Sequence, residues 1–156
     1  MLMKTLIAAT IFILLSGCGF KVVNLSDIEN FNIISVNTEG EKRINYIIKN
    51  NLSKASKKND VNEITINLKT KKNKEIKEKN IKNEITKYEI IIIVDVIVKK
   101  LVDNTTYNFT ISSNGSYSVD SRNSTTRNNE KKLILLLSNK LADKILNETN
   151  IILNDI

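Results

Sequence analysis

The chain has 156 residues and a formal net charge of +7, with 41% hydrophobic and 26% charged residues. This length and composition are typical of one globular domain, and they exclude a largely disordered chain and a second large core. The chain has no histidine and a single cysteine, which excludes histidine-based catalysis and an internal disulfide.

The first predicted element is an export signal over residues 1–17. Lys4 precedes an apolar run from Thr5 to Leu15, and the small residues Ser16 and Gly17 follow it. A membrane-spanning helix needs about 20 apolar residues, so this run is too short to span a bilayer. We therefore expect it to be a cleaved signal peptide.

Cys18 follows directly, in the stretch Leu-Ser-Gly-Cys, which resembles the lipobox of bacterial lipoproteins. The resemblance implies cleavage before Cys18, a diacylglycerol on its thiol and an acyl group on its new amine. A cysteine at this place lies outside any core and has no partner for a disulfide. Two or three acyl chains hold a protein durably on a membrane. The next residue is Gly19 rather than the aspartate that retains lipoproteins at the inner membrane, so the resemblance implies the outer membrane, with the domain facing the periplasm.

Residues 18–30 are expected to form the lipidated tether and residues 31–156 a single domain. Alternating side chains predict a first strand over residues 31–37. Thr38 and Glu41 fit a capping box, and apolar residues at helical spacing follow them, so a helix is predicted over residues 39–56.

Three further strands are predicted after this helix. One begins near residue 62, alternates Ile64, Ile66 and Leu68 with polar residues, and gives way to a lysine-rich loop through residue 82. The next covers residues 86–101 and is rich in β-branched residues. The last covers residues 105–119 and completes a hairpin.

A closing helix is predicted within residues 124–153, and its apolar face is the best-defined helical pattern in the chain. That face consists of Leu133, Ile134, Leu137, Leu141, Ile145 and Leu146, widened by Leu135 and Leu136. The element order β-α-β-β-β-α predicts an α+β fold. We expect a two-layer sandwich, with two helices packed on one face of a mixed four-stranded sheet.

The strand over residues 86–101 is apolar on both faces, although a sheet with helices on one side needs only one apolar face. The face with Ile91, Ile93 and Ile97 would then need a cover, which is either a loop or the tether, or another protein. The alternative is that an isoleucine bias of the sequence fills positions that tolerate it. Asp95 interrupts this face, and a carboxylate in mid-strand without any histidine does not indicate catalysis.

Positive charge gathers in the lysine-rich segment, which includes Lys79 and Lys82, and at the start of the closing helix, where Arg127 lies. Cations near a helix start are typical of phosphate binding. An exported protein with 5% aromatic residues and no recognition motif is not expected to bind nucleic acid. The plainer alternative is a solvated surface, because the lysine, asparagine and isoleucine bias is one that AT-rich coding produces.

Taken together, these segments resemble the LPS-assembly lipoprotein family, LptE. The resemblance is carried by "SGCGFK", the element order, "TKYEIIIIVDV", and the closing segment "SYSVDSRNSTTRNNEKKLILLLSNKLADKIL". It implies a Gram-negative outer-membrane lipoprotein that helps to assemble and plug a large β-barrel, LptD, and binds lipopolysaccharide on its way to the cell surface. It further implies barrel contacts through the Ile91, Ile93 and Ile97 face, and lipid A phosphate contacts at Arg127, Lys79 and Lys82.

The resemblance implies no catalysis, no metal and no cofactor apart from the acyl groups on Cys18. A periplasmic hydrolase is disfavoured, since the sequence has no histidine and no Gly-x-Ser-x-Gly motif. The alternative that stays open is a free-standing outer-membrane lipoprotein that binds lipid or cell wall, because β-α sandwiches host many functions.

Overall fold

A computed structural model describes residues 31–56 and 62–154 of the chain. The expected signal peptide over residues 1–17, the lipidation site Cys18 and the tether over residues 18–30 lie outside the described residues.

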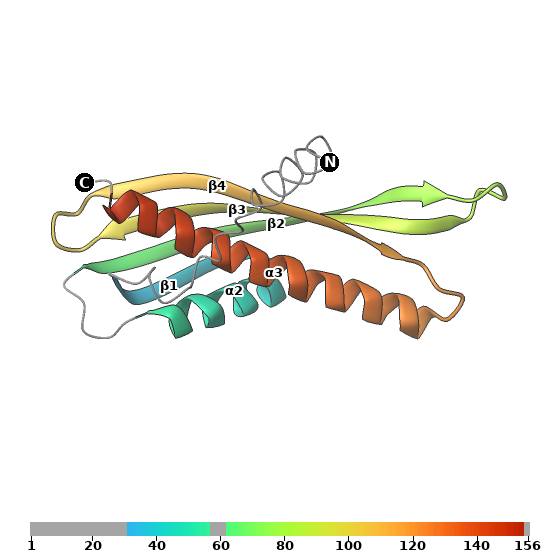
Figure 1. Cartoon of the computed structure of the whole chain (residues 1–156), viewed down its shortest axis with the longest axis horizontal. Coiled ribbons are helices and arrows are strands. Elements are labelled where there is room, and N and C mark those ends of the chain that lie inside the picture. Colours follow the sequence, from blue (N-terminus) through green and yellow to red (C-terminus); the bar gives the residue numbers. More distant parts are fainter. Residues whose placement is uncertain (1–30, 57–61, 155–156) are drawn as a thin grey trace, which may run out of the picture.

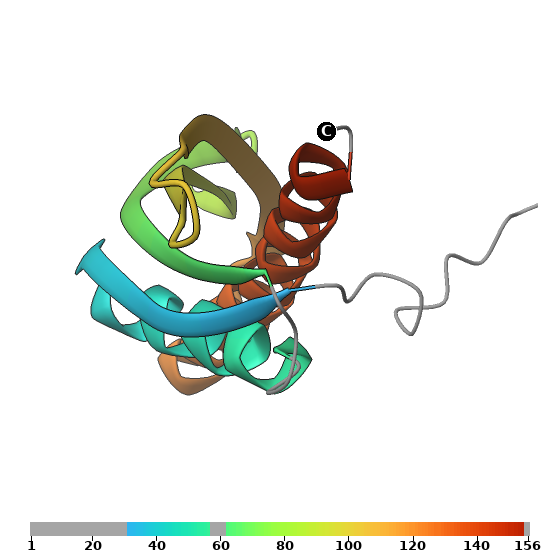
Figure 2. The same ribbon diagram turned by 90° about the vertical axis from the view of Figure 1, so that its left-hand side faces the viewer.

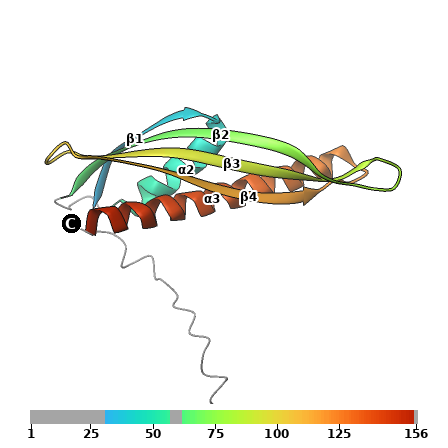
Figure 3. The ribbon, with the colours of Figure 1, turned by 90° about the horizontal axis from the view of Figure 1, so that it is seen from above.

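The fold is a two-layer α+β sandwich, as the sequence predicts (Figure 1). Strands β1 to β4 form one sheet in the order β1-β2-β3-β4, in which β1 pairs in parallel with β2 and the other neighbours are antiparallel. Seen from above, helices α2 and α3 both lie beneath the same face of the sheet (Figure 3). The elements are β1 (Asn32–Gly40), α2 (Lys42–Ala55), β2 (Glu63–Lys79), β3 (Ile85–Lys100), β4 (Thr106–Ser118) and α3 (Asn123–Asn154).

The core lies between the sheet and the two helices. Alternate residues of the strands point toward the helices, because successive side chains of a strand lie on opposite faces. On β3 the buried set runs from Ile90 to Val98, and on α3 it includes Leu141 and Ile145, as predicted. Leu135 and Leu136 differ from the expectation, since they are 48% and 64% exposed on the outer side of α3.

The turn from β1 into α2 depends on Gly40, which has a φ of +96°. Strand β1 continues to Gly40, so α2 begins at Lys42 rather than at residue 39. The predicted capping box is wrong: Glu41 is the N-cap without a side-chain cap hydrogen bond, and Thr38 lies within β1. Instead, the hydroxyl of Thr70 on β2 accepts a hydrogen bond from the Glu41 amide at 2.9 Å.

The lysine-rich segment is not a loop, contrary to the sequence-based expectation. Strand β2 continues to Lys79 and pairs with β3 as far as Ile85. The hairpin closes through Asn80, whose side-chain oxygen accepts hydrogen bonds from the amides of Lys82 and Glu84 at 2.9 and 3.0 Å. Asn83 takes the left-handed conformation, with a φ of +62°, so this turn needs no glycine.

Candidate binding surfaces: the open sheet face and the basic end

The face of the sheet opposite the helices is the first candidate surface. It carries the second apolar row of β3, in which Ile91 and Ile93 are half-buried by their neighbours and Ile97 is 41% exposed. Both described helices lie on the other side (Figure 3). A stripe of isoleucine thus runs along the centre of a face that no described helix covers.

Polar side chains flank this stripe and bond to one another across the strands. Asn37 of β1 donates to Asn67 of β2 at 2.8 Å, and Thr110 of β4 donates to Asp95 at 2.7 Å. These are typical cross-strand pairs. The Thr110 hydrogen bond gives Asp95 a structural partner. Between β1 and β3 the face is hollowed into a shallow depression of about 340 Å³, lined by Asn37, Thr38, Glu39, Asn67, Leu68, Lys69, Asp95 and Ile97.

The second candidate surface is the end of the molecule formed by the β2–β3 hairpin and the start of α3. Strand β1 ends opposite Thr70, so beyond it the sheet continues as β2, β3 and β4 alone. The tip of the β2–β3 hairpin extends past Ser118, the last residue of β4, and α3 begins near this end (Figure 1). Residues 71–89 and 120–132 carry eleven Lys and Arg and six Asp and Glu. The other described residues carry nine and seven. Most of the excess positive charge therefore lies at this end, which we call the basic end.

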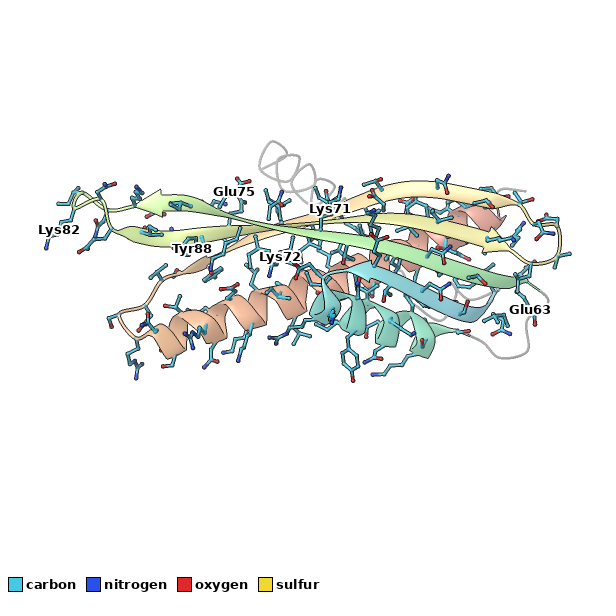
Figure 4. The ribbon with its side chains drawn as sticks, turned by 180° about the vertical axis from the view of Figure 1, so that it is seen from behind. Glu63, Lys71, Lys72, Glu75, Lys82 and Tyr88 are labelled. Atoms are coloured by element: carbon cyan, nitrogen blue, oxygen red, sulfur yellow. The ribbon has the colours of Figure 1, made fainter. Side chains whose placement is uncertain are left out.

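The structure places all three predicted phosphate-binding residues at the basic end, on two separate elements. Lys82 lies at the tip of the hairpin, which projects past the start of α3 (Figure 4). Lys79 ends β2 and donates to the Asn83 side chain at 3.0 Å, while Arg127 is exposed on α3. Among the described residues none of the three forms an ion pair. They share one end of the molecule but do not form one closed pocket.

A cluster that the sequence did not predict joins the hairpin to α3. Lys74 of β2 lies 2.9 Å from the Glu130 carboxylate of α3, and the Tyr117 hydroxyl donates to the same carboxylate oxygen at 2.9 Å. The Lys74 ammonium lies 4.3 Å from the centre of the Tyr88 ring, which stacks on Tyr117 with centroids 5.8 Å apart. These contacts could not be predicted, because Lys74 was expected to lie in a loop.

The cluster shifts the pKa of each of its charged members. Desolvation raises the pKa of Glu130, but hydrogen bonds from Lys74 and Tyr117 outweigh it, so its pKa lies below the ordinary value. Desolvation lowers the pKa of Lys74, and its contacts to Tyr117 and Glu130 reverse this into a net rise. Both groups stay charged at neutral pH, so Lys74 is neutralised within the protein rather than offered to a ligand.

The lowered pKa of Glu130 predicts an acid-sensitive contribution to stability. A carboxyl group with a lowered folded-state pKa stabilises the fold above its unfolded pKa, and the contribution is lost as the pH falls through the folded-state pKa. We expect urea unfolding at decreasing pH to show a loss of stability below about pH 5 that is reduced in Glu130→Gln. The matched control is Glu75→Gln, on the exposed side of the same hairpin. Equal pH dependence in Glu130→Gln and wild type would contradict the assignment.

The described residues show neither a metal centre nor a membrane span. No three His, Cys, Asp or Glu side chains within residues 31–56 and 62–154 group closely enough to hold a metal ion. Over the same residues, no helix combines the length and the apolar character needed to cross a bilayer.

Comparison with known proteins shows a shared fold at low sequence identity. The sequence matches no family model and no curated protein. The crystal structure of rare lipoprotein B from Shewanella oneidensis is similar with a TM-score of 0.56 and 15% identity, over 74% of this chain and 92% of that one. The solution structure of an uncharacterized lipoprotein B from Nitrosomonas europaea is similar with a TM-score of 0.62 and 14% identity, over 86% of this chain and 92% of that one. The β-α-β-β-β-α sandwich is therefore a fold that solved lipoproteins also adopt.

Proposed function

We propose that this protein is a non-catalytic outer-membrane lipoprotein subunit of a lipopolysaccharide translocon, anchored through Cys18. In this role it helps to assemble and plug a β-barrel of the LptD type and binds lipopolysaccharide during delivery to the cell surface. The observation that carries the proposal is the open sheet face with its stripe of Ile91, Ile93 and Ile97. The lipobox resemblance and the fold shared with two proteins named as lipoproteins support the proposed location at a membrane.

The open face has the composition of a binding surface with a polar rim. Its central strand contributes the isoleucines, while β1, β2 and β4 contribute asparagine, threonine and serine on either side. An apolar centre within a polar surround is typical of protein–protein contacts. A barrel wall that supplies apolar side chains over β3 and hydrogen-bonding groups at the rim would complement it.

The basic end fits the phosphates of lipid A better than a neutral partner. Lys79, Lys82 and Arg127 have no carboxylate partner among the described residues, whereas Lys74, Lys77 and Lys87 are paired with Glu130, Glu89 and Glu78. Unpaired cations can approach an anionic ligand without first breaking an ion pair. Lys71, Lys131 and Lys132 of the basic end also have no ion pair among the described residues. We assign the proposed phosphate contacts to Lys79, Lys82 and Arg127, the residues that the sequence resemblance implies.

Replacing Lys79, Lys82 and Arg127 together by glutamine is expected to weaken binding to lipopolysaccharide about a hundredfold. Each basic residue at an anionic lipid surface contributes about 1 kcal/mol, so three contribute about 3 kcal/mol. Binding of the purified protein to immobilised lipopolysaccharide, measured at two salt concentrations, tests this. The matched control replaces the exposed Lys49, Lys54 and Lys140, which lie outside the basic end, and has the same change in net charge. Equal losses in the two variants would show that only overall charge matters and would contradict a phosphate site at the basic end.

A further inference from the structure

The opposite end of the molecule is where the described chain begins. The amide of Asn32, the first residue of β1, donates to the Asn62 carbonyl at 2.8 Å, and β1 pairs there with Glu63 of β2. The Leu101 amide, at the start of the β3–β4 turn, donates to the Glu63 carbonyl at 2.9 Å. Figure 2 faces this end and shows the start of β1, the β3–β4 turn and the last turns of α3 around it.

The β3–β4 turn presents two apolar side chains to solvent. Leu101 is 39% exposed and Val102 is 75% exposed. Hydrogen bonds hold the turn: the Lys100 amide donates to the Thr105 carbonyl, and the Thr105 amide donates to the Asp103 carboxylate, both at 2.9 Å. A turn fixed in this way cannot easily fold its apolar tip back onto the sheet. The last turns of α3 lie at the same end of the molecule (Figure 2), and Ile151 of α3 is 51% exposed.

Among the described residues around the β3–β4 turn, charges are nearly balanced, unlike those at the basic end. Lys99 and Lys100 precede the apolar pair, and Glu63 and Asp103 are the acidic residues beside them. The Asp103 carboxylate bonds back to Thr105, and these hydrogen bonds, with the nearby charge of Lys100, lower its pKa. Apolar contact, rather than net charge, is therefore what this end offers to a partner.

We propose that the β3–β4 turn docks on the phospholipid leaflet that holds the lipid anchor, with Leu101 and Val102 at the boundary between headgroups and acyl chains. Lys99 and Lys100 then lie at the level of the phosphates, where their long side chains reach the headgroups. The inference rests on the anchor at Cys18 that the proposed function includes, and it does not depend on the barrel.

The length of the tether between Cys18 and the domain is the reason that we propose a bilayer as the partner of the β3–β4 turn. Twelve residues separate Cys18 from Phe31, so the anchored membrane lies within about 45 Å of the end that carries the turn. Two apolar side chains bind a bilayer too weakly to recruit a free protein. A short tether raises the local concentration of the membrane to about the millimolar range, where a weak contact is sufficient to orient the domain.

The absence of tryptophan from the chain makes this docking directly measurable. Val102→Trp places one fluorophore in the turn, and Ile81→Trp places one at the hairpin tip, where Ile81 is 103% exposed. Lipidated full-length protein of each variant is reconstituted into vesicles of phosphatidylethanolamine and phosphatidylglycerol and isolated by flotation. We expect the Val102→Trp emission to shift to shorter wavelength and to be quenched by brominated lipid, while the Ile81→Trp emission stays at its value in buffer.

An unshifted Val102→Trp emission in floated protein, or a shift in Ile81→Trp alone, would overturn the docking and leave the anchor intact. A chain that carries no lipid on Cys18 by mass spectrometry would overturn the docking together with the anchor. Because tryptophan itself prefers membrane interfaces, the unmodified turn is tested as well. Hydrogen exchange at the amides of residues 102–104, for which the structure gives no backbone hydrogen bond, should slow in wild type on vesicles relative to detergent-free protein with Cys18→Ser. Unchanged exchange at these amides would contradict the proposal.

Discussion

Gly40→Ala is expected to lower the free energy of unfolding by about 3 kcal/mol or more. A φ of +96° is one that side chains with a Cβ rarely adopt, and a Cβ built there lies 2.0 Å from the carbonyl oxygen of Thr70. That oxygen belongs to the backbone of a strand inside the sheet, so it cannot move aside without disturbing β2. The new methyl group would also displace Thr70 from its hydrogen bonds to Glu41 and Asn45, which hold α2 on the sheet.

Gly115→Ala is the matched control for this prediction. A Cβ at Gly115 lies 2.8 Å from Leu133 Cδ1, which is the end of a side chain that can turn away, and the φ of Gly115 is not positive. Urea unfolding followed by circular dichroism should therefore show a clearly smaller loss for Gly115→Ala. A loss for Gly40→Ala no larger than that of its control would show that the β1–α2 turn is not the constraint described above.

Replacing Ile93 and Ile97 together by lysine is expected to reduce capture of the proposed partner barrel roughly tenfold or more, because each charge would be buried without a partner in the proposed interface. The fold should survive, since both side chains point away from the core and Ile97 is already 41% exposed. The measurement is the amount of barrel recovered with each tagged variant from detergent-solubilised outer membranes, after circular dichroism has shown that the variant is folded.

Leu135→Lys with Leu136→Lys provides the control for the open face. These two leucines lie on the outer side of α3, 48% and 64% exposed, so the variant adds the same charges elsewhere on the surface. Full recovery of the barrel with this control and loss with the isoleucine variant would place the contact on the open face. The reverse outcome would place the contact on α3 and contradict the proposal.

Alternation and helical spacing predicted the architecture because they report directly on which side of an element is buried. The buried row from Ile90 to Val98 and the buried face of α3 were both evident as sequence periods. The hydrogen bonds of the β1–α2 turn could not be predicted from the sequence in this way. Thr38 and Glu41 have the spacing of a capping box, but the strand continues through Gly40. The hydroxyl that accepts a hydrogen bond from the Glu41 amide belongs to Thr70. Thr70 also donates to the carbonyl of Glu39, thirty-one residues before it in the chain.

The length of β2 was missed because its second half has little apolar content of its own. Residues Lys71 to Lys79 are held in the strand by pairing with the isoleucine-rich β3. The two strands form one hairpin, and Asn80 and Asn83 form its turn. Charged residues in an exposed extension have weak β propensity, and a paired neighbour overrides it.

The sequence predicted which residues belong to the candidate surfaces, but it did not predict how those residues are arranged in space. The isoleucine row opposite the core followed from strand alternation once the helices were placed on one side. The gathering of positive charge at one end depends on the hairpin extending β2 past β1 and on α3 beginning nearby, and only the structure shows both (Figure 4). The ion pair between Lys74 and Glu130 joins residues that are 56 positions apart in the sequence, so no local sequence pattern predicts it.

We propose that this protein is the lipid-anchored partner of one large outer-membrane barrel. The measurement that tests it most directly is affinity purification of a carboxyl-terminally tagged protein from detergent-solubilised outer membranes, with Cys18→Ser as the control and mass spectrometry to identify and quantify bound proteins. We expect one stoichiometric LptD-like barrel, recovered with the lipidated wild type. A lipidated, folded protein that is recovered alone would contradict it and would favour the free-standing lipid- or wall-binding lipoprotein.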